Sequence, residues 1–137
     1  MTSKMSIPEI EQFLTRFSKR RFGEIVETGP MQAKMVLPFN DAYLRSGGSI
    51  NGPTQMALAD ICMYVAILAQ IGPSEKAFTT SLNMNFYRRP KPEDLTAQAR
   101  ILKLGTRLVV GDVLLFSGAD EASVSHASLT YSVSETN

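Results

Sequence analysis

The chain has 137 residues, of which 44% are hydrophobic and 20% are charged. This length fits a single domain, residues 1–137, that buries its own hydrophobic core. Cys62 is the only cysteine and His126 the only histidine, which excludes a disulfide framework and a zinc site built from Cys and His. The formal net charge of +1 argues against a dedicated nucleic-acid-binding protein. An anionic ligand therefore needs a local cluster of basic residues.

Neither a membrane span nor an export signal is expected. The N-terminal segment lacks the apolar core and cleavage site of a secretory signal. The most apolar stretch, 56–71, is short for a bilayer span and contains Asp60. We therefore expect a cytoplasmic protein that has no membrane partner, no metal and no bound cofactor.

The N-terminal region predicts a helix. Ser6 and Glu9 have the spacing of a capping box, and Pro8 suits the first helical turn. A single apolar stripe follows at helical spacing, formed by Ile10, Phe13, Leu14 and Phe17. The basic run 19–21 suits a helix C-terminus.

A hairpin and a long helix come next. Segments 24–27 and 31–37 flank the turn 28–30, and the second alternates in the way of a strand with one buried face. After a loop rich in Gly and Ser at 40–52, residues 53–70 leave almost no polar face. That segment predicts a helix covered on nearly all sides.

The rest of the chain predicts four strands, at about 78–86, 95–101, 108–116 and 127–133. In the first of these, one face is expected to carry Phe78, Thr80, Leu82, Met84 and Phe86. The fold class is therefore α+β. We expect an antiparallel sheet of five or six strands wrapped around one central helix, with a further N-terminal helix.

Three segments resemble a known family. Residues 47–53 (GGSINGP), 58–60 (LAD) and 79–90 (TTSLNMNFYRRP) are similar to those of hotdog-fold acyl-CoA thioesterases of the phenylacetate-degradation type. The resemblance covers about residues 24–133. It implies the hotdog fold, hydrolysis of acyl-CoA thioesters and assembly from homodimers, which in turn pair in some members.

The resemblance also assigns candidate catalytic positions. Asp60 stands at the place of the family's acidic residue, and Thr80 matches the family's Ser or Thr on the strand after the helix. Asn51 and Gly52 stand where the family has His-Gly at the helix start. Arg45 occupies the place of a loop asparagine.

The residues themselves support this chemistry. Opening a thioester needs a hydrogen-bond donor at the developing oxyanion, and a carboxylate that attacks or activates water. The amide groups near Gly52 at a helix N-terminus are such donors, and Asp60 is such a carboxylate. Eight residues along a helix span about 12 Å, too far for both to act on one carbonyl. Two antiparallel helices from two subunits would bring them together, which predicts an obligatory dimer.

The substrate-binding candidates have two interpretations each. Arg88 and Arg89 suit the phosphates of coenzyme A, and equally suit a solvated turn. Arg45 fits a plain loop residue, a partner of Asp60 or a group that orients a substrate carboxylate. Tyr64, one turn after Asp60, fits core packing or substrate contact.

The catalytic candidates also have structural interpretations. Asn51 suits a helix N-cap, Gly52 a turn, Thr80 a β-strand position and Asp60 a polar group at a dimer seam. His126 lies on a late strand with no acid spaced to orient it, which argues against a Ser-His-Asp triad. Two functions therefore remain: hydrolysis of an acyl-CoA, and a non-catalytic hotdog module that binds acyl-CoA or another apolar ligand.

Overall fold

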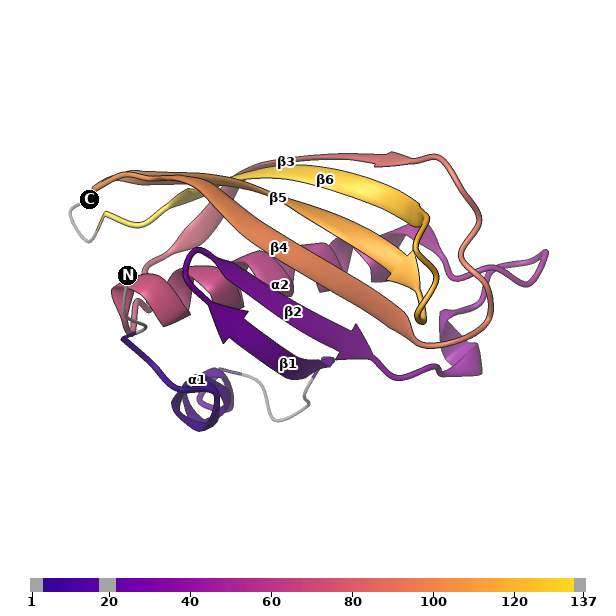
Figure 1. Cartoon of the computed structure of the whole chain (residues 1–137), viewed down its shortest axis with the longest axis horizontal. Helices are drawn as coiled ribbons and strands as arrows, with labels where there is room; N and C mark the ends of the chain where they lie inside the picture. The colour runs from indigo at the N-terminus through magenta and orange to yellow at the C-terminus, as the bar shows by residue number, and fades with distance from the viewer. Residues whose placement is uncertain (1–3, 18–21, 135–137) are drawn as a thin grey trace.

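The structure, a computed structural model, describes residues 4–17 and 22–134. In this part of the chain two α-helices, one short 3₁₀ helix and six strands follow one another (Figure 1). Their order is α1 (Ile7–Leu14), β1 (Glu24–Gly29), β2 (Gln32–Leu37), η1 (Asp41–Tyr43), α2 (Gly52–Ile71), β3 (Phe78–Phe86), β4 (Leu95–Leu104), β5 (Leu108–Ser117) and β6 (Ser123–Ser132).

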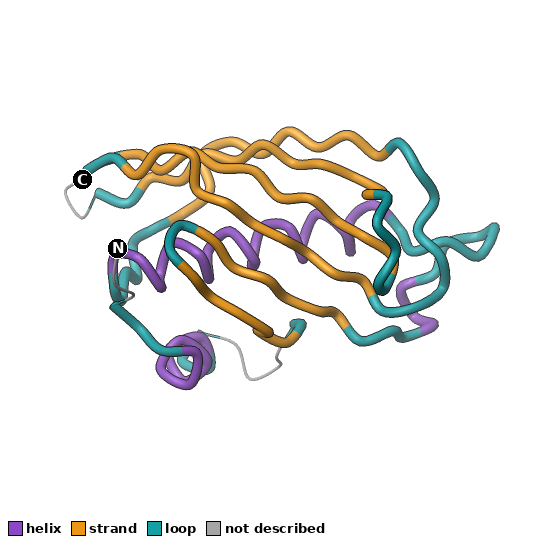
Figure 2. The backbone as a smooth tube through the Cα atoms, viewed as in Figure 1, coloured by secondary structure: helices purple, strands orange, loops and turns teal. Residues whose placement is uncertain are grey.

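The strands form one antiparallel sheet with the order β1-β2-β4-β5-β6-β3. The sheet curves around α2, which runs along its concave face, and α1 lies beside β1 (Figures 1 and 2). This arrangement is the predicted hotdog fold, with six strands. The strands β1 and β3 are the two edges of the sheet.

The predicted capping box starts α1. The Ser6 side chain accepts a hydrogen bond from the Glu9 amide, and the Glu9 side chain accepts one from the Ser6 amide. The helix ends at Leu14, one turn earlier than predicted. Beyond it, the Arg16 and Phe17 amides bond to carbonyls three residues back, and Phe17 is exposed. The basic run 19–21 lies outside the described residues.

Helix α2 forms the centre of the core, and its bounds match the predicted segment. By length and composition it is apolar enough to cross a membrane, but most of it is buried against the sheet, as in the core helix of a folded domain. One stripe in its first half remains uncovered within the chain. That stripe consists of Pro53, Met56 and Ala57, and the partly buried Asp60 continues it.

A β-bulge changes the predicted pattern of β3. Its register against β6 slips by one residue at Thr80. Thr79 pairs with Tyr131 and faces α2, while Phe78 lies on the other face and is exposed. The prediction that alternate residues from Phe78 to Phe86 share one face is therefore wrong for the first part of the strand. The extra residue exchanges the two sheet faces that successive side chains take in the part of the strand before the bulge.

Candidate functional site

The carboxylate of Asp60 is held on one side by two hydroxyl groups. Thr79 Oγ1 donates to Asp60 Oδ1 at 2.6 Å, and Tyr131 Oη donates to the same oxygen at 2.7 Å. Tyr131 Oη also lies 2.9 Å from the main-chain oxygen of Asp60. No described residue hydrogen-bonds to Oδ2. Hydrogen bonds thus fix one carboxylate oxygen and leave the other without a donor from the described residues.

Tyr131 is suited to remain a hydrogen-bond donor. Its side chain is buried, and this burial raises the pKa of its hydroxyl well above the ordinary range. Its ring stacks on that of Tyr64, with ring centroids 6.0 Å apart and planes inclined by 9°. The Tyr64 hydroxyl in turn donates to the Ser74 carbonyl at 2.7 Å. Tyr64 is therefore a partly buried residue that packs against the core and supports the Tyr131 ring, and its second interpretation, substrate contact, stays a prediction.

Asn51 is the N-cap of α2. Its Oδ1 accepts from the Thr54 amide at 2.7 Å, and its Nδ2 donates to the Tyr43 carbonyl at 2.7 Å. The structural interpretation of Asn51 is therefore confirmed. Both polar atoms of the side chain are engaged in fixing the helix start.

The cap leaves one amide group of the first turn available. Pro53 has no N–H, Thr54 donates to the Asn51 side chain, and Gln55 donates to the Asn51 carbonyl at 3.3 Å. Within the described part of the chain, the Gly52 N–H has no acceptor. A free amide at the positive end of a helix is a ready donor to an anion or an oxyanion.

Three arginines gather around this helix start. Arg45, Arg88 and Arg89 line a cavity of about 360 Å³ together with Gly52, and we call this cavity the basic pocket. All three arginines are exposed, and Arg88 Nε donates to the Ser123 carbonyl at 3.2 Å. Residues more than forty positions apart in the sequence thus form one positively charged site. Arg45 lines this pocket and forms no ion pair with Asp60.

The bulge in β3 determines which threonine reaches Asp60. Thr80 is exposed and donates to the Thr130 carbonyl at 3.2 Å, whereas Thr79 donates to the carboxylate. Sequence reasoning missed Thr79 because the alternation was continued through the bulge. It missed Tyr131 because the alternating pattern explains that residue as a buried strand position, and nothing in the sequence indicates that its hydroxyl bonds to Asp60.

Two other reactive side chains lie elsewhere. Burial raises the pKa of the Cys62 thiol to about 12, which keeps it protonated and a poor nucleophile. On the face of the sheet away from α2, His126 Nε2 lies 3.0 Å from Asp112 Oδ2, and Arg100 Nε donates to Asp112 Oδ1 at 2.7 Å. The expectation that no acid would orient His126 is therefore wrong, because Asp112 lies diagonally across the β5–β6 pair.

This His126 cluster is an ion-pair group. Burial raises the pKa of the Asp112 carboxyl, but the bonds from Arg100 and His126 outweigh it and hold that pKa below its ordinary range. In the described chain, no serine or cysteine hydrogen-bonds to His126. The cluster lacks the nucleophile of a triad.

The chain is similar to known proteins in sequence and in structure. Residues 47–124 match a family described as the thioesterase superfamily. A structure from Silicibacter sp. TM1040, described as a candidate thioesterase, is 35% identical, with 96% of this chain and 94% of that chain covered and a TM-score of 0.86. No curated protein sequence matches the chain.

Two more distant structures share the fold. Zebra fish thioesterase superfamily member 2 is 16% identical and has a TM-score of 0.82, with 95% of this chain and 99% of that chain covered. The Escherichia coli PaaI protein from the phenylacetic acid degradation operon is 19% identical and has a TM-score of 0.73, with 81% and 78% covered. Their resemblance to this chain lies in the arrangement of the sheet around the long helix.

The capping role of Asn51 predicts a stability effect. Asn51→Ala should lower the free energy of unfolding by about 1 kcal/mol, because the Thr54 amide loses its acceptor and the Tyr43 carbonyl loses one of its two donors. Urea denaturation followed by circular dichroism measures this change. Asn40→Ala, which removes the cap of the three-residue helix η1, is the control and should cost less. Equal stability of Asn51→Ala and wild type would contradict the capping role.

Proposed function

Since the chain belongs to the thioesterase superfamily, we propose that it hydrolyses acyl-CoA thioesters to the free acid and coenzyme A. In this proposal Asp60 of one subunit acts beside Gly52 of a second subunit. The observation that carries the proposal is the asymmetry of the Asp60 carboxylate, with Oδ1 bound by two hydroxyls and Oδ2 open. A charged group on an apolar helix loses hydration, which lowers the stability of the fold unless the group is fully paired. A carboxylate kept there with only one oxygen bonded is therefore a candidate functional group.

Asp60 would supply the attacking or water-activating oxygen. Thr79 and Tyr131 fix Oδ1, so rotation of the carboxylate is restricted and Oδ2 keeps one direction. Oδ2 then attacks the thioester carbon directly, or takes a proton from a water that attacks it. In the direct route the carbon–sulfur bond breaks as the acyl group forms a mixed anhydride with Asp60, the coenzyme A thiolate takes a proton from solvent, and a water molecule then hydrolyses the anhydride to the free acid. In the other route the water oxygen becomes part of the free acid, the carbon–sulfur bond breaks, and Asp60 passes the proton to the departing thiolate.

The Gly52 amide would stabilise the oxyanion. In either route, negative charge develops on the carbonyl oxygen, and a donor fixed in advance lowers the energy of that state. The Gly52 N–H is free for this role, and the Asn51 cap holds the turn that carries it. The helix dipole adds partial positive charge at the same point.

A second copy of the chain completes the site. Gly52 and Asp60 lie on the same straight helix, so one chain holds them about 12 Å apart. The uncovered stripe of α2 leads up to Asp60, and the edge strand β3 exposes Phe86 beside Gly52. An antiparallel second helix packed on this stripe would cover these apolar groups and set its Gly52 beside Asp60.

The basic pocket would hold coenzyme A. Its three arginines carry fixed positive charge, and guanidinium groups bind phosphate oxygens in pairs of hydrogen bonds. Gly52 lines the same pocket, so the pantetheine arm, which joins the phosphates to the thioester, would run from the arginines past the start of α2.

One observation favours the non-catalytic alternative. The resemblance places Asn51 where the family has a histidine, and both polar atoms of the Asn51 side chain are used in the cap. Asn51 therefore offers the substrate no free hydrogen-bonding atom. A module that binds an acyl-CoA without cleaving it would need the basic pocket and no reactive carboxylate.

The first test is Asp60→Asn, which should reduce turnover by about 10²-fold or more, the scale of a lost general base. The fold should persist because the amide oxygen still accepts from Thr79 and Tyr131. Release of free thiol from a panel of acyl-CoA esters measures this effect. Asp41→Asn, an exposed substitution on η1, is the control and should leave turnover unchanged. An Asp60→Asn protein that is as active as wild type but melts at a lower temperature would support the binding module.

The composite site predicts complementation between two inactive variants. Asp60→Asn lacks the carboxylate, and Gly52→Asp places a negative charge where the oxyanion forms. If each site takes one residue from each subunit, a mixed dimer keeps one intact site, and random mixing should restore about one quarter of wild-type activity. Refolding the two variants together and assaying thiol release tests this expectation. A mixture without activity would contradict a site shared between subunits.

The basic pocket predicts a salt effect. The double substitution Arg88→Ala with Arg89→Ala should raise KM for acyl-CoA by about tenfold with little change in kcat, and should flatten the dependence of KM on ionic strength. Arg107→Ala removes an exposed arginine from the β4–β5 turn and serves as the control. An unchanged salt response in the double variant would make Arg88 and Arg89 solvated turn residues.

A further inference from the structure

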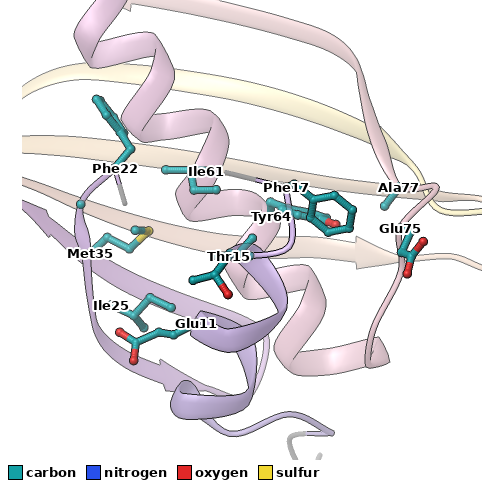
Figure 3. A pocket seen from close by; sticks show the side chains of 12 residues that line it. Glu11, Thr15, Phe17, Phe22, Ile25, Met35, Ile61, Tyr64, Glu75 and Ala77 are labelled. Atoms are coloured by element: carbon teal, nitrogen blue, oxygen red, sulfur yellow. The ribbon is translucent and has the colours of Figure 1, made fainter. Parts of the chain in front are cut away.

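A second cavity lies under the N-terminal helix. It has a volume of about 320 Å³ and is enclosed by α1, β1, β2, α2 and the connection from α2 to β3 (Figure 3). We call it the apolar pocket, because most of its wall is hydrocarbon, including Leu14, Phe22, Ile25, Met35, Ile61 and Ala77. Its volume lies at the lower end of the range for small-molecule sites.

Two elements that line the apolar pocket also carry residues that hold, or lie next to, the Asp60 carboxylate. On α2, Ile61 follows Asp60 directly, and Tyr64 stacks on Tyr131, whose hydroxyl binds the carboxylate. On the other side, Ala77 precedes Thr79 by two residues. Tyr64 thus belongs to the wall of the cavity and also contacts the tyrosine that holds the carboxylate.

The charged residues that line the apolar pocket are all acidic. Glu11 and Glu75 belong to its lining, which contains neither lysine nor arginine. Glu75 forms an exposed ion pair with Arg16 at 3.8 Å. A mostly apolar cavity whose lining contains no basic residue disfavours a ligand group that carries a negative charge, because that charge would lose its hydration without gaining a partner.

We propose that the apolar pocket is the acyl-group site of the enzyme and that it accepts an uncharged acyl chain. This inference rests on the proposed function, since it places the thioester carbonyl at Asp60 with the acyl chain pointing away from coenzyme A. Helix α1 then becomes part of the substrate site. The burial of Ile10 and Phe13 and the capping box at Ser6 hold it in that position.

Binding of stable thioether analogues tests the pocket without any need for catalysis. The probes are S-methyl-CoA and S-octyl-CoA, measured by titration calorimetry. Burial of a methylene group is worth up to about fourfold in affinity, so wild type should bind the octyl analogue at least about thirtyfold more tightly than the methyl one. Equal affinity for the two analogues would overturn the proposal.

Two substitutions fill the pocket from separate walls. Ala77→Leu acts from the α2–β3 connection and Ile25→Phe from β1, and each should reduce the octyl preference to less than about threefold. The control is Ala119→Leu, the same alanine-to-leucine change at an exposed turn, which should keep the full preference for the octyl analogue. Circular dichroism and melting curves identify folded variants, and one folded variant suffices. A folded variant of either kind that keeps the preference would overturn the proposal.

A charged probe and a parallel assay complete the test. A CoA thioether whose octyl chain ends in a carboxylate should bind at least about tenfold more weakly than S-octyl-CoA; equal affinity would overturn the uncharged-chain assignment. Thiol release from octanoyl-CoA is measured on the same preparations. A preference for the octyl analogue without hydrolysis would overturn the proposed function but support the role of the apolar pocket. Hydrolysis without a chain preference would support the proposed function and overturn the role of the pocket.

Discussion

The burial of α2 against the concave face of the sheet is the constraint on which the site depends. This helix has apolar residues on nearly every side and carries a single charged residue, Asp60. A carboxylate in that setting loses hydration and must recover hydrogen bonds from its surroundings. The sheet supplies them through Thr79 on β3 and Tyr131 on β6, which are paired across the two strands. The same packing that makes the core thus orients the acid.

The second constraint is that both proposed reactive groups lie on one rigid element. The start of α2 is fixed by the Asn51 side chain, which leaves the Gly52 amide free, and the carboxylate lies two turns further along. A helix cannot fold back to bring the two together. Symmetry offers a direct solution, because an antiparallel copy of the helix places each Gly52 beside the other Asp60. The edge strand β3 and the stripe at Met56 give that copy an apolar surface to cover.

Local signals in the sequence were sufficient for most of the fold. The Ser6–Glu9 spacing, the apolar run of α2 and the alternation of the late strands each depend on neighbours within one element. The position of Thr79 depends on register, since a single extra residue at Thr80 reverses which face each side chain takes. No local pattern marks such a slip. Likewise, the meeting of Arg45 with Arg88 and Arg89 follows from two loops that return to the same end of α2.

The choice of hydroxyl donors has a chemical consequence. A lysine or arginine beside Asp60 would satisfy the carboxylate fully, but it would also neutralise the charge that makes the oxygen reactive. Hydroxyl groups orient the carboxylate and leave its charge in place. Burial keeps the pKa of the Tyr131 hydroxyl high, so this donor holds its proton. Because both donors bind Oδ1, they restrict one oxygen and leave the other for the proposed reaction.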